Sequence, residues 1–219
     1  KACCMLSEIN SFTETSGQLS FRGAGRFSVS YKLDNTGAAR RLFLLLKGRL
    51  GISPSLHFVQ TSQLGGRRTS VLTLNEADSK TLLRALHRLE TDEYGQIRMR
   101  HTIPRHPMTR QCCRRAYFRG AFLGAGTVAN PEKDYHFEWT AEDDHLPEML
   151  SKLLEKSGMP FHSYTRRGRR VVYLKGAEEI SSILALMGAG KSVMNMENIR
   201  IKKQIRETAT RDRKSTRLN

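Results

Sequence analysis

The fold is decided by one stretch in the second half of the chain, Cys112-Cys-Arg-Arg-Ala-Tyr-Phe-Arg-Gly-Ala-Phe-Leu-Gly-Ala-Gly126. After its cysteine pair, the stretch predicts a helix of about 12 residues. The helix would end at a glycine, the residue best suited to a left-handed cap. We therefore treat this stretch as the start of a structural unit and compare the rest of the chain with it.

The same pattern occurs once before, near the start of the chain. The pair Cys3-Cys4 lies 109 residues earlier and is followed by Met-Leu-Ser-Glu-Ile-Asn-Ser-Phe-Thr-Glu-Thr-Ser-Gly17. This stretch also predicts a helix that ends at a glycine. The chain is therefore interpreted as an internal repeat.

The residues after each predicted helix follow the same order of strands and helices. In the second copy, hydrophobic periodicity predicts strands at 135–139, 160–165 and 171–175 and helices at 141–156, closed by Gly158, and 177–187. In the first copy it predicts strands at 27–31, 55–60 and 68–74 and helices at 36–50 and 76–89. The expected fold class is α+β, with two αββαββα units related by pseudo-twofold symmetry.

The repeat sets the expected domain boundaries. Residues 1–90 form the first unit and residues 111–190 the second. Residues 91–110 contain Pro104 and Pro107 without sustained periodicity, which is typical of a linker. Residues 191–211 are expected to form an exit helix that leads onward.

The last eight residues, 212–219, read Asp-Arg-Lys-Ser-Thr-Arg-Leu-Asn. A common sequencing-adapter oligonucleotide encodes this peptide when it is translated in frame. We therefore expect residues 212–219 to be an artefact, and we exclude them from the fold. The natural protein would then be longer.

The chain carries 37 lysine and arginine residues against 21 acidic residues, a formal charge of +16, and the excess lies in both halves. A spread positive charge favours a polyanionic partner, most often nucleic acid. No apolar run approaches the roughly 18 to 20 residues that cross a bilayer, and no secretory signal is visible. The expected location is cytoplasmic.

The four cysteines form two adjacent pairs, Cys3-Cys4 and Cys112-Cys113. Neither pair has the spacing of a zinc site, and adjacent cysteines on a helix rarely bond to each other because their Cβ atoms diverge. They are interpreted as small apolar residues at helix starts in a reducing compartment, and neither a metal nor a cofactor is predicted. A metal site shared by the two pairs is the alternative.

A duplicated αββαββα unit whose first helix ends in a glycine-capped motif of small residues resembles the LAGLIDADG homing endonucleases. In that family two motif helices pack side by side, and small residues allow their backbones to approach closely. The resemblance implies a motif-helix interface made of Gly17, Gly120, Ala121, Gly124, Ala125 and Gly126. In the endonucleases an acidic residue before the final glycine binds the catalytic metal. Here those positions hold Ser16 and Ala125, which lack the carboxylate oxygens that Mg²⁺ requires.

A finer resemblance is to the WhiA family of bacterial regulators, over about residues 1–211. It rests on the stretch from Cys112 to Val128 and on the segments Asn130-Pro-Glu-Lys133, Tyr135-His-Phe-Glu138, Val172-Tyr-Leu-Lys175 and Glu197-Asn-Ile-Arg200, with Arg206. It implies a DNA-binding transcriptional regulator, without catalytic residues, of sporulation, cell division and chromosome segregation. In the family a helix-turn-helix domain follows and is expected to make most sequence-specific contacts. The implied partners are double-stranded DNA and other regulatory proteins, and the implied location is the nucleoid.

Basic residues in three places are the candidate DNA contacts. They lie in the predicted turns between paired strands and on the exit helix: Arg67, Arg68, Arg166, Arg167, Arg169, Arg170, Lys202, Lys203 and Arg206. The alternative for each place is a solvated, charged surface. For Arg119, beside the small-residue face, a structural ion pair is as well supported as DNA contact. The acidic residues Glu142, Asp143 and Asp144 are expected at a helix N-terminus rather than at a metal.

Two other functions compete with the regulator. The first is a metal-dependent DNA endonuclease, which the missing motif carboxylates disfavour. The second is a scaffold that binds a small molecule or a protein through the same surface. The sequence names no ligand for that scaffold.

Overall fold

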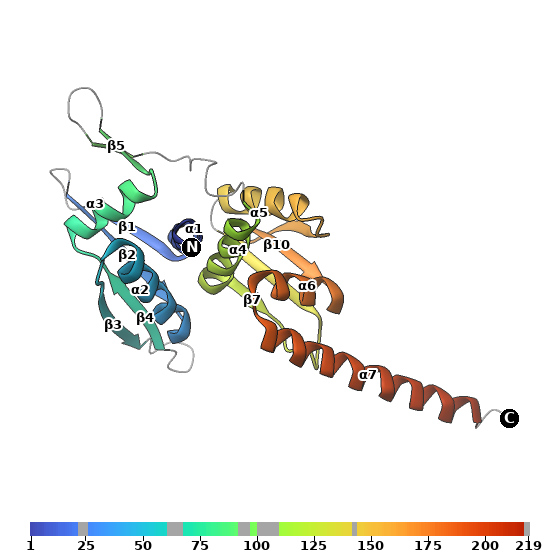
Figure 1. Cartoon of the computed structure of the whole chain (residues 1–219). Coiled ribbons are helices and arrows are strands. Elements are labelled where there is room, and N and C mark those ends of the chain that lie inside the picture. Colours follow the sequence, from blue (N-terminus) through green and yellow to red (C-terminus); the bar gives the residue numbers. More distant parts are fainter. Residues whose placement is uncertain (22–25, 61–67, 92–96, 100–109, 142–143, 217–219) are drawn as a thin grey trace. The chain divides into compact units, whose positions relative to one another are not determined.

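The computed structural model describes residues 1–21, 26–60, 68–91, 97–99, 110–141 and 144–216 (Figure 1). The chain divides into two compact units, residues 1–125 and 126–219. The division falls after the helix that contains the second glycine motif, so this helix packs with the first unit. No helix within the described ranges is both long and apolar enough to cross a membrane.

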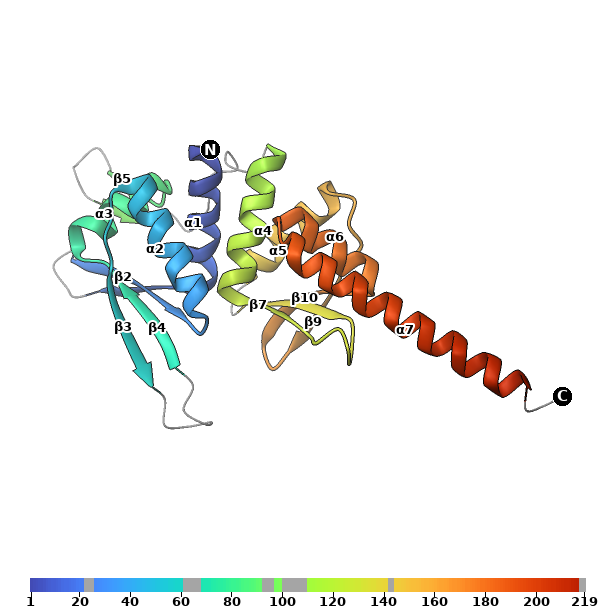
Figure 2. The same ribbon diagram turned by 60° about the horizontal axis from the view of Figure 1, so that its bottom comes forward.

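The first unit contains a four-stranded antiparallel sheet with strand order β1-β2-β4-β3. Its elements are α1 (Ala2–Ser16), β1 (Gly17–Phe21), β2 (Phe27–Leu33), α2 (Thr36–Leu50), β3 (Ser55–Gln60), β4 (Arg68–Thr73), α3 (Glu76–Ala85), β5 (Leu89–Thr91), β6 (Ile97–Met99) and α4 (Gln111–Ala125). Helices α1 and α4 lie side by side in both views (Figures 1 and 2). The duplicated motif therefore forms a helix pair.

The second unit repeats this sheet, with strand order β7-β8-β10-β9. Its elements are β7 (Gly126–Val128), β8 (His136–Ala141), α5 (His145–Lys156), β9 (His162–Arg166), β10 (Arg169–Lys175), α6 (Ala177–Met187) and α7 (Gly190–Thr216). The predicted α+β class and the repeated order of elements are confirmed.

Local signals explain the helices whose predicted bounds are matched by the structure. The Asn35 side chain accepts hydrogen bonds from the backbone N–H groups of Gly37 and Ala38 and so caps α2. Gly51 ends the same helix with φ 69°, and Gly188 ends α6 with φ 85°. Both ends of α2 and the C-terminal end of α6 thus carry residue types that stabilise helix ends.

Alternating strands and apolar helix stripes form the core of each unit. In the second unit Phe137, Trp139, Val172 and Leu174 are buried on one face of the sheet, where α5 contacts β8 and β10 and α6 contacts β10. In the first unit the buried apolar residues of α2 and α3 are Ala38, Ala39, Leu42, Leu45, Leu46, Leu82 and Leu83. Each sheet therefore has a helix-covered face and an opposite face.

The structure corrects the predicted glycine caps of the motif helices. Gly17 has φ −77° and ψ 134°, which is extended backbone, because the chain passes directly from α1 into β1. Gly126 likewise begins β7. A Cβ at residue 17 would lie 2.4 Å from the Thr13 carbonyl oxygen, so close approach within α1, and not a left-handed turn, favours glycine there.

Several element bounds also differ from the prediction. Helix α5 begins at His145 and not at residue 141, because Ala141 still pairs with Arg170 in the sheet. Helix α3 ends at Ala85, and Leu89 begins a short antiparallel pair between β5 and β6. Strand β6 lies inside the predicted linker 91–110, so that segment contains regular structure. Helix α7 runs from Gly190 to Thr216, past both ends of the predicted exit helix.

Candidate nucleic-acid interface

The basic turn of the second unit is a two-residue hairpin loop. Arg167 and Gly168 both have positive φ, 51° and 75°, which is the geometry that a type I′ turn requires. Arg166 and Arg169 pair across the two strands next to the loop. Three of the four predicted turn arginines therefore lie in strands β9 and β10, and only Arg167 lies in the turn.

Strand alternation separates these arginines onto two faces of the sheet. Arg170 pairs with the buried Ala141, on the face that α5 and α6 cover, and its Nε lies 3.4 Å from Asp144 Oδ1. Arg166 and Arg169 lie on the opposite face, because they are one residue out of phase with Arg170. Asp144 directly precedes α5, as expected for the acidic cluster, whereas Glu142 and Asp143 lie outside the described residues.

An open hollow of about 660 Å³ lies on this outer face. It is lined by Thr140 of β8 and by Arg166, Arg167 and Arg169. Arg166 is 54% exposed. The hollow is therefore a basic concavity at the tip of a hairpin, which suits an anionic backbone such as that of DNA.

Glu138 anchors one of these arginines. His136 Nε2 lies 3.0 Å from Glu138 Oε2, and Arg166 Nη2 donates to Glu138 Oε1 at 3.2 Å. Partial burial by itself would raise the pKa of Glu138, but the contacts with His136 and Arg166 outweigh it and hold the pKa below its ordinary value. Glu138 is therefore ionised at neutral pH and orients Arg166 on the outer face.

Four aromatic side chains lie together on the outer face, a cluster that was not predicted from the sequence. Tyr173 stacks with His136 at 5.5 Å and with His162 at 5.2 Å between ring centroids, and it meets Tyr164 edge to face at 5.3 Å. Lys175 Nζ lies 5.5 Å from the Tyr173 ring centroid. The signal was present in the sequence, since His162, Tyr164 and Tyr173 occupy positions of one parity on paired strands.

In the first unit the predicted DNA contacts lie at positions less suited to binding DNA. Arg68 begins β4 in phase with the buried Ser70 and Leu72, and its guanidinium carbon lies 4.0 Å from the centroid of the Phe58 ring. Alternation thus places Arg68 on the helix-covered side of the sheet, although its side chain is exposed. Arg67 lies outside the described residues.

On α7 the predicted basic residues are spread around the helix. Lys202 and Arg206 are exposed and one turn apart, whereas Lys203 is half-buried with its Nζ 4.6 Å from the Tyr135 ring centroid. Lys203 therefore packs against the body of the second unit. Lys202 and Arg206 are placed where a polyanion can reach them.

The motif helices α1 and α4 pack closely through glycine. A Cβ at Gly120 would lie 2.1 Å from Ser11 Oγ and 2.5 Å from the Glu8 carbonyl oxygen, and one at Gly124 would lie 1.9 Å from Thr15 Oγ1. Ala121 is buried, as expected of the interface. Gly17 and Ala125 are half-buried at the ends of these helices, and Gly126 pairs with Trp139 in the second sheet.

Two acidic residues of α1 with little-exposed side chains stabilise the helix pair, and the sequence pattern predicted neither role. Glu8 is 1% exposed and contacts Arg41 of α2 and Arg119 of α4, each at 2.8 Å. Glu14 pairs with Arg88 at 2.9 Å and accepts a hydrogen bond from the Tyr117 hydroxyl of α4. Arg119 is thus engaged in the structural ion pair that the sequence had left as one alternative.

The positions directly before the final glycines of the two motifs hold Ser16 and Ala125, and neither carries a carboxylate. Ser16 Oγ donates to the Phe12 carbonyl oxygen at 2.9 Å, within its own helix, and Ala125 offers no ligand atom. Among the described residues, the four cysteines form the one group of three or more His, Cys, Asp or Glu side chains placed to share an ion. Ser16 and Ala125 thus offer no carboxylate oxygen, the ligand that Mg²⁺ prefers.

Comparison with known families decides the assignment. The WhiA N-terminal LAGLIDADG-like domain matches residues 2–88, and the WhiA LAGLIDADG-like domain matches residues 114–206. The chain belongs to the WhiA family. A probable cell division protein WhiA of Heliobacterium modesticaldum is 32% identical over 96% of the chain and 65% of its own length. The WhiA of Alkaliphilus metalliredigens is 30% identical over 96% of the chain and 67% of its own length. The chain thus spans about two thirds of these WhiA proteins.

Solved structures confirm the fold. Full-length WhiA from Thermatoga maritima superposes with a TM-score of 0.70 at 18% identity, covering 99% of the chain and 68% of that protein. The homing endonuclease I-DmoI, solved in complex with DNA and Mn, superposes with a TM-score of 0.58 at 12% identity, covering 85% of the chain and 98% of that protein. The duplicated LAGLIDADG-like architecture inferred from the sequence is therefore present.

Proposed function

We propose that this WhiA-family chain is a non-catalytic DNA-binding module of a regulator of cell division, sporulation and chromosome segregation, and that it acts at the nucleoid. The observation that carries the proposal is the basic hollow of the second unit, where Arg166, Arg167 and Arg169 lie together on the outer face of the sheet. Cationic side chains on a sheet face can bind phosphates and displace counterions. The net charge of +16 supports a polyanionic partner.

Two further observations support binding without cleavage. The motif helices end at Ser16 and Ala125, so they lack the carboxylates that hold Mg²⁺ in a nuclease of this fold. The tyrosine and histidine side chains beside the hollow offer flat surfaces that can pack against sugars or bases. The sheet would supply affinity through phosphate contacts.

The role of the outer face is tested with a double variant, Arg166→Ala/Arg169→Ala. We expect weaker binding of a fluorescent DNA duplex and a slope of log K against log salt that is shallower by about 1.8, because each phosphate contact contributes about 0.9. The measurement is fluorescence anisotropy at several salt concentrations. Removal of Arg166 also leaves the ionised Glu138 with its His136 contact but without the arginine charge, which makes the same face still less favourable for a polyanion.

The matched control is Arg170→Ala. It removes one positive charge, half of the charge lost in the double variant, from the same hairpin but from the helix-covered face, where Arg170 Nε lies 3.4 Å from Asp144 Oδ1. We expect its salt slope to remain within about 0.3 of the unmodified chain, well below one phosphate contact. Equal slopes for the double variant and the unmodified chain would contradict the assignment of the outer face.

A further inference from the structure

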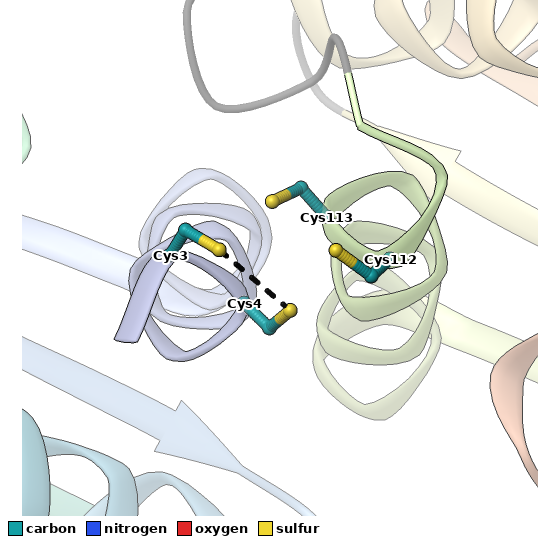
Figure 3. A group of neighbouring side chains, drawn as sticks. All are labelled: Cys3, Cys4, Cys112 and Cys113. Carbon is teal, nitrogen blue, oxygen red and sulfur yellow. Dashed lines mark hydrogen bonds between the residues drawn. The ribbon is translucent and has the colours of Figure 1, made fainter. Parts of the chain in front are cut away.

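The two cysteine pairs, 109 residues apart in the sequence, meet in the folded protein. Cys3 and Cys4 lie in the first turn of α1, and Cys112 and Cys113 lie in the first turn of α4. All four Sγ atoms lie within 4.8 Å of one another. Figure 3 shows the four sulfurs gathered in the space between the two helix starts.

We propose that these four cysteines bind one thiophilic metal ion, with Zn²⁺ as the ion that the geometry fits, and that the ion links the N-termini of α1 and α4. In a tetrahedral site with Zn–S bonds of about 2.3 Å, neighbouring sulfurs lie about 3.8 Å apart. Cys3 Sγ and Cys4 Sγ are already 4.0 Å apart. Small side-chain rotations would close the remaining distances.

The donor set selects the class of ion. Four sulfur ligands suit a soft or borderline metal and disfavour Mg²⁺ and Ca²⁺, which take oxygen ligands. A Zn²⁺ ion bound by four thiolates carries a net charge of −2. The N-terminal ends of two helices meet at the site, and each provides free backbone N–H groups and a partial positive charge that stabilise thiolates. Lys1 and Arg110 precede these helices and add positive charge.

The surroundings keep the site in place and leave it accessible. Cys113 is 2% exposed, while Cys3, Cys4 and Cys112 are half-buried, so an ion can enter from one side. Ser7 Oγ of α1 donates to the Cys113 carbonyl oxygen of α4 at 2.7 Å. This hydrogen bond links the second turn of α1 to the first turn of α4, next to the four sulfurs.

Sequence spacing alone did not favour this site, since neither pair has the separation of a zinc motif. Each adjacent pair supplies two ligands only because the partner helix brings the other pair opposite to it. Binding of one Zn²⁺ by four thiols releases up to four protons, and the metal therefore binds more tightly as pH rises.

The test uses the full chain, reduced with a phosphine and stripped of metal by a chelator. Co²⁺ is titrated first, as a spectroscopic probe, and is then displaced with Zn²⁺. We expect one Co²⁺ per chain, with the ligand-field and sulfur-to-metal absorption bands of a tetrahedral thiolate site, and full displacement by one Zn²⁺. We also expect Zn²⁺ to raise the midpoint of thermal unfolding, because the ion joins two helices.

The decisive variant is Cys3→Ser/Cys112→Ser, which removes one half-buried ligand from each helix and leaves Cys113 in the core. Loss of an outer-shell partner alone weakens metal sites 10- to 100-fold, so loss of two ligands should lower the affinity at least about 100-fold. Ser16→Ala, at the other end of α1, is the matched control and should keep one ion per chain. Circular dichroism checks that both variants fold.

Three outcomes would overturn the proposal. The reduced chain takes up no Co²⁺, or the double variant binds Zn²⁺ as tightly as the unmodified chain, or the metal-free chain merely forms a cystine between the two pairs in air and shows no metal affinity after reduction.

Discussion

Gly120→Ala is expected to lower the free energy of unfolding by about 3 kcal/mol, the upper end of overpacking penalties. The new Cβ would lie 2.5 Å from the Glu8 carbonyl oxygen and 2.1 Å from Ser11 Oγ. The carbonyl is backbone of the buried face of α1, so the clash is relieved only if the two motif helices separate. Alanine is the better helix former by up to about 1 kcal/mol, which offsets only part of this loss. Urea denaturation of the chain measures the change.

Gly48→Ala is the control for helix propensity. Residue 48 lies within α2, and the one atom outside α2 that its Cβ would meet within 4 Å, among the described residues, is Met5 Cε at 3.4 Å. We expect this variant to be unchanged or more stable by up to about 1 kcal/mol. Equal effects of the substitutions at 120 and 48 would contradict close helix packing.

At Gly124 the clash is with the Thr15 side chain, so Thr15→Ala should recover part of the stability lost in Gly124→Ala.

Glu8→Gln is expected to lower the free energy of unfolding at pH 7 by about 3 kcal/mol, as found when one member of a buried ion pair is removed. Glu8 is 1% exposed and connects three helices through Arg41 and Arg119. Burial alone would raise the pKa of Glu8, but hydrogen bonds from Arg41 and Arg119 outweigh it, and the pKa lies below its ordinary value. The neutral amide keeps the shape of the side chain and loses these charged contacts.

The sign of the pH dependence follows from the lowered pKa of Glu8. Its contribution to stability is present above the pKa of the unfolded chain and is lost as pH falls through the lower pKa of the folded chain. We therefore expect the difference in free energy of unfolding between Glu8→Gln and the unmodified chain to shrink as the pH is lowered from 7 into the acid range. Glu76→Gln removes the partly exposed partner of Lys80 and should cost only about 0.5 kcal/mol. A Glu8→Gln difference that is constant with pH would contradict the ion-pair explanation.

Much of the fold could be predicted because its signals are local. Helix α2 and strand β3 match their predicted ranges. For α2 the reason is that Asn35 and Gly51 cap the helix and apolar periodicity marks its buried face. Helix α6 likewise ends at Gly188. The prediction was wrong at Gly17, where the sequence suggested a helix-capping glycine but the chain continues directly from α1 into a strand.

The candidate sites were harder to predict because they depend on which residues meet. A shift of one position decides that Arg169 lies on the outer face of the sheet and Arg170 on the helix-covered face. Glu8 looks like an ordinary polar residue of an amphipathic helix until α2 and α4 bring Arg41 and Arg119 to it. The cysteine pairs converge only through the packing of α1 against α4.

On the proposed function, this WhiA-family chain binds DNA through its LAGLIDADG-like fold and does not cleave it. The most direct test is to incubate the chain with supercoiled plasmid and Mg²⁺ at low salt, and to compare the gel mobility of the plasmid before and after the protein is removed. We expect the plasmid to be retarded in the presence of protein and to return as intact supercoiled DNA. Nicked or linear product, or no retardation at any protein concentration, would contradict the claim.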